Sequence, residues 1–134
     1  MRLLFAIFAI FLAVAACAQE FKPYPKARIT ESQWQSYFDE VRSKHGPSEK
    51  RFPSEHLVVF EDTQAMLTWA FTTAGHPAHP AWVTRQPVQD SRGVYLRQIG
   101  YFAGEEQPFA EMFRAYQALN ERMREDFKAK SEKR

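Results

Sequence analysis

The chain of 134 residues has few of the features that mark common functional classes. It contains one cysteine, Cys17, so a disulfide within the chain has no second partner. Its five glycines are too scattered to form a glycine-rich phosphate loop, so we expect no nucleotide site. The net charge is only +2 and basic residues are interspersed with acidic ones, which argues against nucleic acid as a partner.

The composition favours one folded domain. Apolar residues make up 45% of the chain and aromatic residues 15%, including 12 Phe, which is enough large apolar surface for a packed core. The length is sufficient for one domain and too short for two of ordinary size.

The first residues are typical of a secretory signal. Met1-Arg2 supplies a positive start, and an uninterrupted apolar run follows from Leu3 to Ala16. A membrane-spanning helix needs about 20 apolar residues, and this run is shorter and ends in small residues. We therefore predict a signal peptide over residues 1–17.

Two cleavage sites compete at the end of this signal. Val14-Ala15-Ala16-Cys17 resembles the lipobox of bacterial lipoproteins, with Val where Leu is usual, and implies a lipid on Cys17. The alternative, an A-x-A site at Ala16-Cys17-Ala18, would release a soluble periplasmic or secreted protein. The lone cysteine favours lipidation, because a lipid site needs only one. Ala18, and not Asp, follows Cys17. By resemblance to Gram-negative lipoprotein sorting, this implies the outer membrane, with the domain facing the periplasm.

The mature chain is predicted to hold a tether and one α+β domain. Residues 18–29 contain two prolines and no periodic apolar pattern, so we expect a semi-extended tether. In residues 30–134, a capping box at Thr30 predicts a helix that stops at Gly46-Pro47, and four strand-like segments follow at residues 57–60, 66–72, 82–88 and 94–103. Short connections favour an antiparallel sheet. The prediction is a four-stranded antiparallel sheet flanked by an N-terminal and a longer C-terminal helix, both on one face.

The last helix carries a long apolar stripe that begins after Glu105-Glu106. Its members recur at helical spacing, and we interpret them as core residues: Phe109, Met112, Phe113, Tyr116, Leu119, Met123 and Phe127.

The stretch between the second and third predicted strands is the best candidate for a recognition surface. Two His-Pro steps restrict the backbone there, so we expect a stiff polyproline crossing with both imidazole rings on one edge. The alternative is that the histidines hydrogen-bond neighbouring loops and shape a turn. The predicted recognition edge consists of His76, Pro77, His79, Pro80 and Trp82.

The sequence contains no complete catalytic or metal-binding set. His76 and His79 could hold a metal, but only His45 and His56 are left as further imidazole ligands, so we predict no metal and no other cofactor. No G-x-S-x-G elbow is present, and adjacent acidic pairs diverge on a regular element. We therefore predict a non-enzymatic lipoprotein that binds an envelope protein or polymer. The alternative is a small periplasmic enzyme or metal-binding protein that uses His76 and His79.

Overall fold

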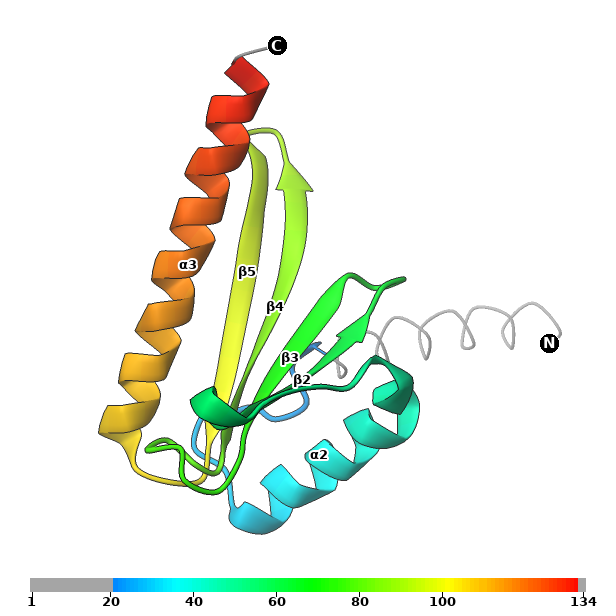
Figure 1. Ribbon diagram of the computed structural model, residues 1–134, viewed down its shortest axis with the longest axis vertical. Helices are drawn as coiled ribbons and strands as arrows, with labels where there is room; N and C mark the ends of the chain where they lie inside the picture. The colour runs from blue at the N-terminus through cyan, green and yellow to red at the C-terminus, as the bar shows by residue number, and fades with distance from the viewer. Residues whose placement is uncertain (1–20, 133–134) are drawn as a thin grey trace, which may run out of the picture.

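The computed structural model describes residues 21–132 (Figure 1). The predicted signal peptide, Cys17 and residues 18–20 lie outside this range, so the expectations about them stay predictions. The elements are helix α2 (Glu31–His45), strands β1 (Lys50–Phe52), β2 (Leu57–Asp62), β3 (Leu67–Thr72), β4 (Ala81–Asp90) and β5 (Gly93–Phe102), and helix α3 (Glu106–Glu132). Short 3-10 turns at Gly46–Ser48 and Pro53–Glu55 flank β1.

The strands form one antiparallel sheet in the order β1-β2-β3-β4-β5. The predicted α+β class and antiparallel pairing are confirmed, but the sheet has five strands and not four. The strand missed by the sequence is β1, which lies at the edge and has all three residues exposed. Such a short, exposed edge strand leaves no alternating apolar pattern to detect.

The two helices cover opposite faces of the sheet, so the prediction of both on one face is wrong. Phe71, Trp82 and Tyr101 lie side by side across three strands and pack in the same core cluster as α2. The next row across β4 and β5, Val83 and Gly100, faces α3. Because successive side chains of a strand point to opposite faces, both rows are apolar only when both faces are covered.

Helix α2 seals the more aromatic face. The predicted capping box is present, since the Thr30 hydroxyl accepts from the Gln33 amide while the Gln33 side chain accepts from the Thr30 amide. Trp34 and Tyr37 of the helix are buried, and the Tyr37 ring stacks on Trp82 with centroids 4.5 Å apart. This face is the centre of the larger core cluster.

The described part of the predicted tether, residues 21–29, packs against the sheet. Tyr101 donates its hydroxyl to the Tyr24 carbonyl at 2.7 Å, and the two rings meet edge to face. Ile29 is buried, and Arg28 forms a parallel bridge with Phe102 of β5. The expectation of a tether stays a prediction for residues 18–20 alone.

Helix α3 meets the sheet closely at Gly100. A Cβ atom there would lie 2.7 Å from Phe109 and 3.0 Å from Phe113, so glycine is what allows the approach. Gly100 pairs regularly with Val83, so β5 has no bulge at this position.

The sheet narrows to a two-stranded arm toward its far end. Strand β3 pairs with β4 only as far as Arg85, whereas β4 and β5 stay paired to Asp90 and Gly93. Figure 1 shows α3 running along this arm. Pro87 lies in the part of β4 that has only β5 as a strand neighbour, a position that suits a residue without an amide donor.

Candidate functional site

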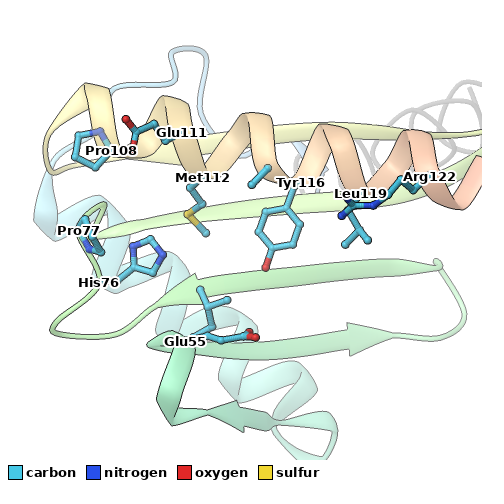
Figure 2. Close-up of a pocket in the computed structure, with 11 residues that line it drawn as sticks. Glu55, His76, Pro77, Pro108, Glu111, Met112, Tyr116, Leu119 and Arg122 are labelled. Carbon is cyan, nitrogen blue, oxygen red and sulfur yellow. The ribbon is translucent and has the colours of Figure 1, made fainter.

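A groove of about 510 Å³ lies between α3 and the start of β2 (Figure 2). Its volume is within the range of ordinary ligand sites. The helix supplies Met112, Ala115, Tyr116 and Leu119, and the opposite wall includes Leu57. The groove exists because α3 packs on β4 and β5 while β2 lies farther across the same sheet.

Charged side chains stand at the two ends of the groove. Glu111 lies beside Pro108 at one end, and Arg122 lies about 16 Å from it along the helix, from eleven residues at 1.5 Å rise. Glu55 lies on the opposite wall, across from Tyr116. All three charged residues are exposed. Within residues 21–132 none of them forms an ion pair. The groove therefore offers an apolar centre with opposite charges at its ends.

Tyr116 is held in place on the wall of the groove. The Arg85 guanidinium lies 4.8 Å from the centre of its ring and donates to the Asn120 side chain at 2.9 Å. Burial raises the pKa of Tyr116, and Glu55 raises it further, while Arg85 lowers it. The phenol is therefore neutral at physiological pH and can serve as a hydrogen-bonding group in the groove.

The loop between β3 and β4 is a pair of turns and not a polyproline crossing. The amide of His76 donates to the Thr73 carbonyl at 3.1 Å, and the amide of His79 donates to the His76 carbonyl at 3.0 Å. Gly75 has φ +103°, where a side chain would be strained. Ala78 is fully buried. The expected extended edge is thus wrong, because hydrogen bonds within the loop fold it back on itself.

The two histidines lie in different surroundings. His79 shares a 2.8 Å hydrogen bond with the Thr72 hydroxyl, and its ring meets Trp34 of α2 edge to face at 5.1 Å. His76 accepts a hydrogen bond from the Ala78 amide through Nδ1 and lines the groove near α3. These contacts match the alternative in which the histidines hydrogen-bond neighbouring groups and shape a turn. Of the two histidines, only His76 lines the groove.

Burial is the main cause of the lowered pKa of both imidazoles. It lowers the pKa of His76, and the neighbouring His56 and His79 lower it further. Burial also lowers the pKa of His79, although a hydrogen bond with Thr72 and the charge of Glu31 act in the opposite direction. Both rings are therefore mainly neutral near pH 7.

The members of the predicted recognition edge do not share one surface. Trp82 has no exposed area and lies in the aromatic core beneath α2. Pro80 is partly buried, and its carbonyl accepts from the Ala103 amide at 2.8 Å. Only His76 and Pro77 reach the groove. In this fold Trp82 contributes packing and no contact surface.

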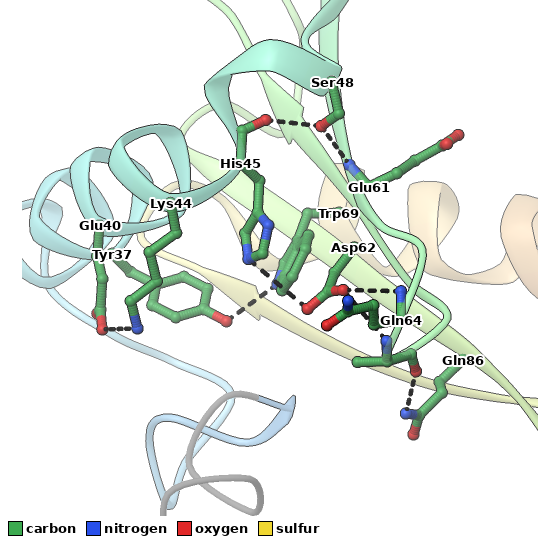
Figure 3. Close-up of polar contacts among 11 residues, drawn as sticks. Tyr37, Glu40, Lys44, His45, Ser48, Glu61, Asp62, Gln64, Trp69 and Gln86 are labelled. Carbon is green, nitrogen blue, oxygen red and sulfur yellow. Dashed lines mark hydrogen bonds and ion pairs between the residues drawn. The ribbon is translucent and has the colours of Figure 1, made fainter.

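A second polar cluster joins the end of α2 to the sheet (Figure 3). The His45 ring stacks on Trp69 with centroids 4.9 Å apart, and its Nε2 lies 3.9 Å from an Asp62 oxygen. The Ser48 hydroxyl donates to the His45 carbonyl at 2.7 Å and accepts from the Glu61 amide at 2.8 Å. Because the Ser48 hydroxyl is hydrogen-bonded to two backbone groups, this set of Ser, His and Asp holds the end of α2 against the sheet and does not form a nucleophilic triad.

Among residues 21–132, no three His, Cys, Asp or Glu side chains gather in a way that could hold a metal ion. No helix in the same range is both long enough and apolar enough to cross a membrane.

The groove was missed by the sequence interpretation because its walls come from segments far apart in the chain. Leu57 lies in a predicted strand and Leu119 in a predicted core stripe, and no local pattern shows that they face each other. The one signal in the sequence was the length of the apolar stripe, because a helix of 27 residues is longer than a short sheet can cover and part of the stripe must stay exposed. No protein-family model matches this chain, and no similar protein was found among the curated proteins or the solved structures.

Proposed function

We propose that this protein is a non-enzymatic binding module of the cell envelope, anchored by a lipid on Cys17, and that it binds a protein partner in the groove beside α3. The groove supports this proposal best, because it combines an apolar centre with unpaired charges at both ends. Surfaces of this kind are typical of sites that receive a segment of another protein.

The charges favour a partner segment with a definite direction. Glu111 would attract a basic side chain or a helix N-terminus, while Arg122 would attract an acidic group or a C-terminus. The apolar centre would receive one or two large side chains next to Tyr116 and Leu119. A segment bound the other way round would place like charges together, which gives the groove orientation as well as affinity.

The exposed apolar side chains of α3 beyond the groove support the same proposal. Met123 is 41% exposed and Phe127 is 71% exposed, so the predicted core stripe is buried only in its first half. The core interpretation is confirmed for Phe109 and Met112 and is wrong for the last two members. Their exposure extends the apolar surface from the groove toward the C-terminus.

The test compares two substitutions on α3 in the full-length protein. Leu119→Glu places a charge in the groove, whereas Gln117→Glu places the same charge on an exposed position of the helix outside it. Partners are recovered from envelope extracts, purified and titrated against each variant. We expect Leu119→Glu to weaken direct binding at least about tenfold and Gln117→Glu to leave it unchanged.

Equal affinity of both variants would contradict the groove as the binding site. Metal-dependent activity that is lost on replacing His76 and His79 would contradict the non-enzymatic assignment. Mass spectrometry of the mature N-terminus tests the anchor, and a free N-terminus at Gln19 would rule it out.

A further inference from the structure

A second exposed surface lies around the first described residues of the chain. It consists of Phe21, Lys22, Met66, Tyr95 and Arg97, and we refer to these five as the anchor-side patch. The members come from three segments that are distant in sequence: the start of the domain, the β2–β3 turn and strand β5.

Direct contacts connect Phe21 and Arg97 with the β2–β3 turn. The Arg97 guanidinium lies 3.8 Å from the centre of the Phe21 ring, and its Nε donates to the Gln86 side chain at 2.8 Å. Gln86 in turn donates to the carbonyl of Ala65 at 2.8 Å, next to Met66. Tyr95 is two residues from Arg97 on the same strand and so on the same face of the sheet.

The patch combines exposed apolar groups with cations. Met66 is 58% exposed and Tyr95 is 40% exposed, and both Lys22 and Arg97 are exposed. Asp62, beside the β2–β3 turn, accepts from the amides of that turn, and Asp90, at the end of β4, accepts from the Arg92 amide. Tyrosine beside basic residues suits the boundary of an anionic bilayer, where the ring reaches the headgroups and the cations meet negative charge.

The length of chain before the patch brings it close to the proposed anchor. Cys17 is four residues before Phe21, so the fully extended chain between them spans at most about 14 Å. Helix α3, with 27 residues, is about 40 Å long. The connection is therefore much shorter than the domain, and a lipid on Cys17 would keep the surface around Phe21 near the headgroups.

We infer that the anchor-side patch lies against the anionic membrane surface and fixes the orientation of the domain. This inference rests on the proposed lipid anchor at Cys17. The groove beside α3 lies on the opposite face of the sheet, so this orientation leaves it open to a partner. One lipid-attached cysteine and one basic, aromatic patch together give the two signals that hold a protein in a defined pose.

The test measures the distance of two labelled positions from the bilayer. Tyr95→Cys and Gln117→Cys are each made in the full-length lipoprotein, where lipid occupies Cys17 and leaves one free thiol for a fluorophore. The proteins are reconstituted in vesicles of phosphatidylethanolamine and phosphatidylglycerol that carry a quencher on the headgroups. We expect most of the fluorescence at position 95 to be quenched and little at position 117.

Two controls distinguish a failure of the inferred orientation from a failure of the proposed lipid anchor. Vesicles of neutral phosphatidylcholine should reduce the quenching at position 95 while the protein stays attached, and Lys22→Glu should do the same in anionic vesicles. Equal quenching at positions 95 and 117 in a protein shown by mass spectrometry to be lipidated would overturn the inference alone. An unmodified Cys17 would overturn both the anchor and the orientation.

Discussion

The two faces of the sheet differ in how completely they are covered. On the α2 face, a helix of 15 residues closes over Trp69, Phe71 and Trp82, each of which has no exposed area. On the α3 face, a helix of 27 residues covers a smaller core and then continues with exposed apolar side chains. The shorter helix thus closes the larger core.

With the proposed function, this difference would separate stability from recognition within one small domain. Large aromatic rings that contact one another contribute most where water is fully excluded, so the α2 face should dominate the free energy of unfolding. The α3 face keeps apolar surface in contact with water, which costs stability and is the surface on which the proposed partner would bind. The predictions below compare the two faces, beginning with the largest effect.

The largest effect is expected for Trp82→Ala, which removes a ring in contact with Tyr37, Phe71 and Tyr101. The loss should be about 3 to 5 kcal/mol in the free energy of unfolding, measured by chemical denaturation. The matched change on the other face, Phe127→Ala, should shift it by no more than about 0.5 kcal/mol. Similar losses for both variants would remove the distinction between the faces.

A smaller loss is expected for Gly100→Ala, because the added methyl group would lie 2.7 Å from Phe109 and push α3 away from β5. Overpacking of this kind costs roughly 1 to 3 kcal/mol. Gly46→Ala is the control, since nothing lies within 4 Å of its Cβ position and its backbone is helical. If thermal unfolding showed Gly100→Ala to be as stable as Gly46→Ala, the close contact of α3 would be disproved.

Substitutions of the two histidines should also differ, one affecting mainly stability and the other mainly partner binding. His79→Gln loses the Thr72 hydrogen bond and the Trp34 contact on the α2 side, so stability should fall by about 1 kcal/mol. His76→Gln should change stability less and partner binding more, because His76 lines the groove. Denaturation and a binding titration of both variants decide this, and the reverse pattern would contradict the assignment.

The smallest effect is expected from pH. Burial lowers the pKa of His76 and His79 below the ordinary value of 6.5, so the unfolded chain binds protons more readily than the folded domain. The contribution to stability is therefore complete above pH 6.5 and is lost as the pH falls through the lowered pKa values. Urea midpoints should drop between pH 7.5 and 5, and the drop should be smaller when both histidines are replaced by Gln. A midpoint that rises on acidification would contradict the sign.

Local patterns in the sequence predicted most of the individual elements. The capping box at Thr30 places the start of α2 correctly, and the alternation of Leu67, Trp69 and Phe71 identifies β3. These signals depend on hydrogen bonds and side-chain directions within a few residues, so they can be recognised without the rest of the fold.

The sequence alone could not show which helix each face of a strand packs against, because that depends on distant parts of the chain. Strand β4 carries both Trp82 and Val83 as buried residues, and only the assembled sheet shows that one faces α2 and the other α3. The turns at His76 and His79 depend on partners such as Thr72 and Trp34. The groove needs Leu57 and Leu119 together, which are brought close only by the whole fold.

The contacts of residues 21–29 with β5 imply an order of folding. Every strand pairs with its neighbour along the chain, so the sheet can form step by step through local hairpins. Tyr24 instead bonds to Tyr101, 77 positions later, and Arg28 bridges to Phe102. Residues 21–29 can therefore dock only after β5 has formed, and this contact closes a loop that spans most of the domain.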